Sequence, residues 1–284
     1  MRSPLLAFGS TALAVLAGCT TSVLPSGEAA DAEVSSTATG IVVVEGSSAN
    51  EGAHTEAVAR FVRARGGAVD DDALRMVGAT VDFPALGACG SLPAARASAS
   101  RPLALLDVGG VTLFAGDAVA TLQPRQLPDV ADLVSGVVYS ARSEVLPSKS
   151  AYLLRIDGAP EADVTPFVVS ASSPGEPSDV RFGGDDGRSG AVSIATGAPV
   201  DLTWEAGSAD DLVYVDVAAT SASPATRCLF VDGGHAVLAA SAFGPLEDGT
   251  IAVHRLHRES FRAHGVDPGE VRFDFARVVS FVRR

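Results

Sequence analysis

The sequence has few basic residues, and all but one of them are arginine. Its 284 residues contain 21 Lys plus Arg against 34 Asp plus Glu, with Lys149 as the single lysine, so the formal net charge is -13. Nucleic-acid binding and attraction to anionic lipid both depend on basic surface. We therefore expect no nucleic-acid partner, and any membrane attachment must come from something other than a basic face.

Cysteine and aromatic residues are also scarce. There are three Cys, one Trp and three Tyr, and aromatic residues make up 6% of the chain. The cysteines form neither a zinc-binding pattern nor a C-x-x-C redox pair. Trp204 alternates with polar residues on an apolar strand face, which predicts a place in the core. A carbohydrate- or cell-wall-binding module would need a sheet face that exposes this Trp or a Tyr.

An apolar run of about a dozen residues near the N-terminus is too short to cross a bilayer, which takes about 20. It follows Arg2 and ends in Leu16-Ala17-Gly18-Cys19. One positive charge, a short apolar region and small residues are typical of a signal peptide. The four residues at its end resemble the lipobox of bacterial lipoprotein precursors.

The resemblance implies that residues 1–18 are removed as a signal peptide and that the Cys19 thiol receives a diacylglycerol. It also implies fatty acylation, such as palmitate, of the new amino terminus and anchoring in the cell envelope. Thr20 in place of Asp implies the outer membrane if the cell has one. Residues 19–40 are rich in Thr, Ser, Gly and Ala, which predicts a flexible tether.

If Cys19 carries lipid, Cys89 and Cys228 are the two cysteines that remain. Exported compartments permit disulfides. A Cys89–Cys228 bridge is therefore one possibility, and two buried free thiols are the other.

Short apolar runs broken by Gly, Pro and Asp predict a mainly β protein. In residues 41–175 we expect a β-rich domain with one or two short helices. The helical segments expected there are 51–65, where apolar residues have helical spacing, and 70–77, where acids precede an apolar stretch. Residues 123–134 contain two Pro and are expected to form a loop.

Glycine pairs and polar segments predict the turns and the domain boundary. Gly109-Gly110 and Gly116-Asp117 lie between apolar runs and predict hairpin turns. Residues 171–190 are rich in Ser, Pro, Gly and Asp, and they are the best candidate for a boundary between domains.

Apolar and polar residues alternate most clearly in residues 187–284, for example along 213–217 and 271–275. One apolar and one charged face indicates antiparallel strands, and several such short strands favour a β-sandwich. This part resembles immunoglobulin-like sandwich domains of uncharacterised secreted proteins from GC-rich bacteria. The resemblance implies a fold but no activity.

The sharpest chemical feature is His254-Arg255-Leu256-His257-Arg258-Glu259, followed by His264. In a strand, positions 254 and 257 face opposite sides, and the acid of the zinc pattern H-E-x-x-H is missing. We therefore expect an exposed basic segment and no metal site. Nucleophile motifs such as G-x-S-x-G are absent from the sequence, so no catalytic residue and no cofactor are predicted.

These observations predict a membrane-anchored envelope lipoprotein whose body is a non-catalytic binding or structural module. Its partner would be an envelope protein or a surface ligand. The alternatives are a carbohydrate- or cell-wall-binding module and an enzyme whose site is assembled only in three dimensions. A pocket lined by His and carboxylates with shifted pKa values would favour the enzyme.

Overall fold

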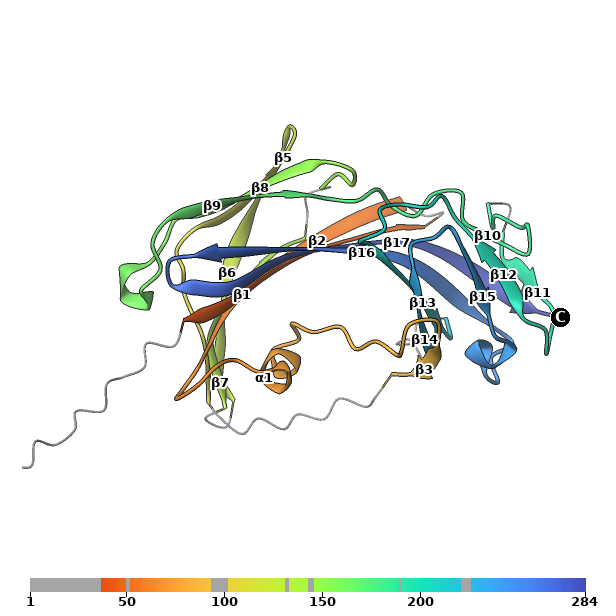
Figure 1. The fold of residues 1–284 in the computed structure, drawn as a ribbon, viewed down its shortest axis with the longest axis horizontal. Coiled ribbons are helices and arrows are strands. Elements are labelled where there is room, and N and C mark those ends of the chain that lie inside the picture. Colours follow the sequence, from red (N-terminus) through yellow and green to blue (C-terminus); the bar gives the residue numbers. More distant parts are fainter. Residues whose placement is uncertain are drawn as a thin grey trace, which may run out of the picture. The chain divides into compact units, whose positions relative to one another are not determined.

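The computed structural model describes residues 37–49, 52–92, 102–130, 133–142, 146–188, 190–220 and 226–284 (Figure 1). Cys19, the expected signal peptide and most of the expected tether lie outside these residues. All the described residues belong to one unit, Ser35–Arg284. No helix among them is long and apolar enough to span a bilayer.

The chain is mainly β, which confirms the expected fold class. The first half contains β1 (Ala38–Ala49), β2 (Gly52–Ala64), α1 (Asp71–Met76), β3 (Cys89–Ser91), β4 (Leu103–Leu105), β5 (Val111–Ala115), β6 (Ala118–Val130), β7 (Val134–Ala141), β8 (Ala151–Ile156) and β9 (Phe167–Ser172). The second half contains β10 (Arg181–Phe182), β11 (Val192–Ile194), β12 (Val200–Thr203), β13 (Leu212–Ala218), β14 (Thr226–Val231), β15 (His235–Leu238), β16 (Asp248–Ala263) and β17 (Val266–Arg283). Two 3-10 turns, Pro160–Ala162 and Ala240–Phe243, complete the elements.

One large sheet runs through both expected domains, in the order β3-β14-β13-β16-β17-β1-β2-β4-β7-β6-β5-β8-β9, with β11 beside β17. The long strands β16 and β17 form an antiparallel pair. Most other pairs are also antiparallel, but β1–β17, β4–β7 and β11–β17 are parallel. Strands β10, β12 and β15 form a second, separate sheet.

Two main hydrophobic cores lie on the same face of the large sheet. Phe273 and Phe275 of β17 belong to the first core, and Val279 and Phe281 of the same strand belong to the second. Residues at even spacing along a strand share a face, so β17 contributes to both cores from one side. Each such buried side chain contributes about 1.5–3 kcal/mol.

The second core is a two-layer sandwich. Leu202 and Leu238 of the small sheet pack with Val215 and Ile251 of the large sheet. Trp204 lies in this core with 5% of its surface exposed, as its strand pattern predicted. The C-terminal part is therefore held by burial between two sheets.

The opposite face of the large sheet is covered by residues 71–92, which we call the covering segment. Helix α1 begins after Asp70, whose carboxylate accepts a hydrogen bond from the Ala73 N–H at 2.8 Å. Ala79 packs with Ile41 and Val43 of β1, and Phe83 packs with the cluster around Tyr214. The covering segment thereby forms a layer over β1, β13 and β16.

The prediction of a helix at 51–65 is wrong, because these residues form strand β2. Thr55, Ala57, Ala59 and Phe61 are buried on alternate positions, which is the period of a strand. Val62 is buried on the other face against β4. Burial on both faces produced the apparent helical spacing, and pairing with β1 along its whole length decides the structure.

Three further expectations are corrected. The loop predicted at 123–134 is mostly strand β6; Pro124 is tolerated because β6 there pairs with β7 alone, so its nitrogen need not donate to a second strand. Gly109-Gly110 does not form a hairpin, because β4 pairs with β2 and β7 rather than β5. The last residues assigned to the tether, 38–40, are buried in β1.

Candidate functional site

A polar cavity of about 460 Å³ lies between the large sheet and the covering segment. Its floor comes from β1, β2, β13, β14, β16 and β17, and its wall comes from residues 80–82 and Leu92. This volume is typical of small-molecule sites. The residues that line it are Glu45, Gly46, Ser47, His54, Glu56, Thr80, Val81, Asp82, Leu92, Tyr214, Asp216, Arg227, His254, Asp274 and Ala276.

Strand register explains why these residues meet. Tyr214, His254, Ala276, Ser47 and His54 are successive partners across β13, β16, β17, β1 and β2. Partners in one register row point to the same face of a sheet. A neighbouring row brings Asp274, Glu45 and Glu56 side by side, so two adjacent rows supply most of the floor.

A buried chain of hydrogen bonds runs through Tyr214, Asp274 and His254. The Tyr214 hydroxyl donates to Asp274 Oδ2, and His254 Nδ1 lies 2.8 Å from Asp274 Oδ1. An ionised carboxylate only accepts, so Nδ1 carries the hydrogen of that bond. Burial, followed by the Asp274 charge, raises the pKa of Tyr214 well above its ordinary value. Tyr214 is therefore a neutral donor that fixes the Asp274 carboxylate.

Arg227 and Asp216 form a two-pronged ion pair at one end of the cavity. Arg227 Nε and Nη2 each lie 2.7 Å from an Asp216 oxygen. The guanidinium carbon is 4.5 Å from the centre of the Tyr214 ring, and the His254 ring stacks on the Tyr214 ring with centroids 4.1 Å apart. Burial lowers the pKa of Arg227, but the hydrogen bonds and charge of Asp216 outweigh it and raise the pKa overall.

Glu45 is the acid of the cavity that lacks a close partner. It is exposed to the cavity, and among the described residues it has no hydrogen bond or ion pair. Desolvation by the cavity walls, followed by the charges of Asp274 and Glu56, raises its pKa. His254 and Arg60 oppose this change.

The covering segment is tied to the floor at both ends of the cavity wall. Arg227 Nη1 donates to the Asp82 carbonyl oxygen at 3.1 Å, and Arg272 Nη1 donates to that of Ala79 at 3.1 Å. Cys89 and Cys228 are joined by a disulfide, which links β3 to β14 beside Arg227. Cys228 is fully buried in the second core.

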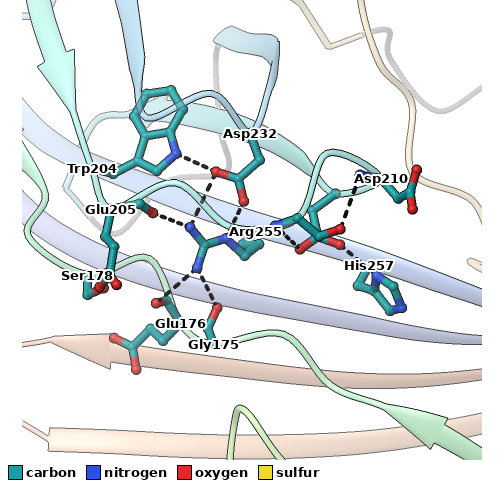
Figure 2. A network of polar contacts seen from close by, with 11 residues as sticks. Gly175, Glu176, Ser178, Trp204, Glu205, Asp210, Asp232, Arg255 and His257 are labelled. Carbon is teal, nitrogen blue, oxygen red and sulfur yellow. Dashed lines mark hydrogen bonds and ion pairs between the residues drawn. The ribbon is translucent and has the colours of Figure 1, made fainter.

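A second polar cluster lies on the other face of β16, around Arg255 (Figure 2). Arg255 Nε lies 2.6 Å from Asp232 Oδ2, and Trp204 Nε1 donates to Asp232 Oδ1 at 2.6 Å. Arg255 also donates to the carbonyl oxygens of Gly175, Glu176 and Glu205. We call this arrangement the Arg255 clasp.

The Arg255 clasp is structural, because its members satisfy one another. The Arg255 and Asp232 side chains are 5% and 0% exposed. A Cβ on Gly207 would lie 2.3 Å from Asp232 Oδ2, so glycine is needed for this close approach. The clasp joins the segment after β9 to β16 and closes the end of the sandwich core.

The prediction of an exposed basic segment at 254–259 is therefore wrong. Residues 254 and 257 do face opposite sides of β16, but Arg255 is 4% exposed and His254 lines the cavity. His257 Nδ1 lies 2.6 Å from the Asp211 carboxylate. These residues are strand positions with acidic partners from distant segments, and those partners are invisible in the local sequence.

Of the remaining predicted site residues, the structure describes His264 but not Cys19. His264 lies outside the cavity, 3.7 Å from Asp163. No group of three or more potential metal ligands occurs within the described residues. Cys19 lies outside the described part, so its lipidation stays a prediction.

The sequence pattern indicated His254 as a candidate site residue but not its partners. It indicated Tyr214, Asp216 and Asp274 only as positions in alternating strands. Each of these polar residues lies within an otherwise apolar strand. Such positions are normally expected to face solvent, but they can also mark a polar site on the sheet.

Comparisons with known proteins add little. No family model and no curated protein matches the chain. Among solved structures, the FN1–FN3 domains of chicken CNTN1 match with a TM-score of 0.25 and 11% identity, over 81% of this chain and 78% of that one. A TM-score of this size supports no inference, and the fold assignment rests on the strands of this chain.

Proposed function

We propose that this chain is an exported lipoprotein, held in the cell envelope by lipid on Cys19, whose β-structured body is a binding module with its site in the polar cavity. The anchoring part rests on Leu16-Ala17-Gly18-Cys19 and the short apolar run before it. Acyl chains contribute about 0.8 kcal/mol per buried methylene, so two or more hold a protein stably at a membrane.

The observation that carries the binding role is the convergence of six strands on one concave polar site. A well-formed pocket with a few convergent polar groups and perturbed pKa values is the usual first candidate for a ligand site. In the polar cavity, Tyr214, His254, Asp274 and Glu45 converge, and the pKa values of Tyr214 and Glu45 are raised.

Lipid labelling tests the anchoring. Cells expressing the wild-type chain or Cys19→Ser are grown with a labelled fatty acid, and the membrane fraction is examined. Label and membrane retention in the wild type, with loss of both in the variant, are expected. Equal membrane retention of the two forms would contradict the lipid anchor. Glu161→Gln, which changes an exposed acid and leaves Cys19 in place, serves as the control.

An enzyme is the second candidate, and one specific observation favours it. His254 is oriented by Asp274, which is itself held by Tyr214, an arrangement that can position an imidazole for proton transfer. Mass spectrometry of a probe recovered from the cavity discriminates the two roles. A binding module returns the probe unchanged, whereas an enzyme returns a product whose formation stops in His254→Gln.

The carbohydrate-binding alternative lacks an aromatic platform. Trp204, Tyr139, Tyr152 and Tyr214 are all at least 95% buried. None of these four rings offers an exposed face on which a sugar could stack.

A further inference from the structure

Strand β9 ends the large sheet, and the side of it that faces away from β8 is held to β16 by a side chain. The N–H of Ser173, the residue after β9, donates to the Ser150 carbonyl oxygen at 2.9 Å. Successive N–H groups of an antiparallel strand point to opposite sides, so the Ser172 N–H points away from β8. It donates to Glu259 Oε1 of β16 at 2.7 Å. A carboxylate of β16 therefore satisfies the edge of the sheet at this point.

Glu259 is itself held by His257, two residues earlier on the same face of β16. His257 Nε2 lies 3.3 Å from Glu259 Oε1, and His257 Nδ1 lies 2.6 Å from Asp211 Oδ1. The His257 ring lies beside the Arg255 clasp (Figure 2). The side chain of Asp211 is 3% exposed and that of Glu259 is 33% exposed. We call Asp211, His257 and Glu259 the His257 bridge, because one imidazole joins a buried acid to a half-buried one.

The protonation state of His257 decides whether both contacts can exist. An ionised carboxylate only accepts hydrogen bonds, and a neutral imidazole has one N–H donor. Both hydrogen bonds therefore require the imidazolium form. A neutral His257 retains the shorter and more deeply buried bond to Asp211. Its Nε2 lone pair then faces Glu259 Oε1, and that contact becomes repulsive.

Titratable neighbours of the His257 bridge include Tyr152, Arg255 and Asp210, and they do not replace the imidazolium charge. Tyr152 packs against Phe273, on which the imidazole stacks, and burial raises the pKa of Tyr152, so its hydroxyl is neutral. Arg255 is engaged by its own partners in the clasp. Asp210 is exposed and negative. Deprotonation of the imidazole thus leaves Glu259 without a cation from these residues.

We propose that the His257 bridge is a pH-sensitive contact, which fastens β9 to β16 when His257 is protonated and releases the Ser172 N–H when His257 is neutral. Imidazoles change charge between about pH 5 and pH 8. The contact is complete on the acidic side of this range and is lost as pH rises, because the Nε2 hydrogen is removed. Phe167 and Phe261, whose rings pack at this junction, then hold β9 without the hydrogen bond. The bridge and the polar cavity lie on opposite faces of the sheet, so the inference goes beyond the binding role.

Hydrogen–deuterium exchange of the full-length chain in mild detergent tests the proposal. Mass spectrometry of overlapping peptides that end on either side of Ser172 reports the exchange of its amide. Exchange is measured from about pH 5 to pH 8 and corrected for the intrinsic pH dependence of amide exchange. The protection of this amide should fall by about tenfold or more over the range, which corresponds to about 1.4 kcal/mol or more.

Two variants should alter the bridge in opposite ways. In His257→Gln, one amide donor replaces two ring N–H groups, so protection at Ser172 should be low and independent of pH. In Glu259→Gln, the amide oxygen still accepts from the Ser172 N–H and the amide nitrogen donates to neutral His257. Protection should then stay high across the range. His235→Gln changes a histidine of the small sheet that is 59% exposed, and it should behave as the wild type does.

The pattern across these variants decides the matter even if His257→Gln fails to fold. Protection at Ser172 that is independent of pH in the wild type would overturn the proposal. An unchanged pH dependence in Glu259→Gln would also overturn it. If the wild type loses protection throughout the sheet together with β9, global unfolding rather than the His257 bridge is the cause. The lipid-labelling test of Cys19 is independent of all these results.

Discussion

At the scale of single residues, the buried charges of Arg255 and Asp232 have close partners, whereas the carboxylate of Glu45 has no hydrogen bond or ion pair among the described residues. Arg255 and Asp232 are buried and saturated with hydrogen bonds. Glu45 faces a cavity and has two acidic neighbours. Removing a partner from a buried pair leaves an uncompensated charge, whereas neutralising a repelled acid relieves strain, so the two sites should respond to mutation with opposite signs.

The pH dependence of stability follows from Glu45. Its pKa is raised above the ordinary value of 4.5 by desolvation and then by Asp274 and Glu56. The folded chain thus holds this proton more tightly than the unfolded chain, and the resulting stabilisation, full below pH 4.5, is lost as pH rises through the folded pKa. Glu45→Gln should melt like the wild type at acidic pH and above it at pH 7.5.

Thermal melting from about pH 4 to pH 8 measures this difference. We expect a gain of a few degrees at most, because about 1 kcal/mol shifts the melting temperature by about 2–4 °C in a domain of this size. A difference that is independent of pH, or a lower melting temperature for Glu45→Gln at pH 7.5, would show that Glu45 is not repelled in the folded chain.

The Arg255 clasp gives the opposite prediction. Arg255→Met should lower the free energy of unfolding by about 3–5 kcal/mol, because Asp232 is left buried without its cation. Arg155→Met is the matched control, since Arg155 and Asp157 are 60% and 51% exposed, and exposed pairs contribute about 1 kcal/mol or less. Urea denaturation measures both. Equal losses in the two variants would contradict a structural role for the clasp.

At the scale of elements, strands with one buried face were predictable and strands with two were not. Strand β13 and much of β17 alternate visibly, and they match the expectation. Strand β2 buries Phe61 on one face and Val62 on the other, which imitates a helix. The cavity could not be predicted, because strand register joins Glu45, Tyr214 and Asp274 across the sheet, and no local pattern encodes that register.

The covering segment is the element on which the cavity depends. Its C-terminal end is tied to β14 by the Cys89–Cys228 disulfide, and Thr80 and Asp82 precede that tie. Disulfides stabilise mainly by restricting the unfolded chain, typically by about 2–4 kcal/mol. The double variant Cys89→Ser/Cys228→Ser should lose stability of this order.

Urea denaturation of that double variant checks the expectation. A loss of about 2–4 kcal/mol would show that the disulfide stabilises the fold that holds the cavity wall. Unchanged stability would mean that packing of Ala79 and Phe83 alone positions the covering segment.

At the scale of the whole molecule, the sheet joins residues from both ends of the described chain. Strand β1, the first after the N-terminal segment, pairs with β17, the last. The two cores divide within the expected boundary segment 171–190, yet β17 belongs to both. Alternation in the sequence predicted the mainly β class, but the parallel β1–β17 pairing is a long-range contact that no local signal announces.

At the same scale, the proposed lipid on Cys19 would hold this body at a membrane surface. That claim depends on the chemistry of one sulfur atom, since the acidic composition gives the body no electrostatic attraction to anionic lipid. Intact-mass and peptide mass spectrometry of the mature protein from its native envelope test it most directly. We expect the mature protein to begin at Cys19, with a diacylglycerol thioether on its sulfur and an acylated amino group. A mature protein that begins at another residue, or at an unmodified Cys19, would contradict it.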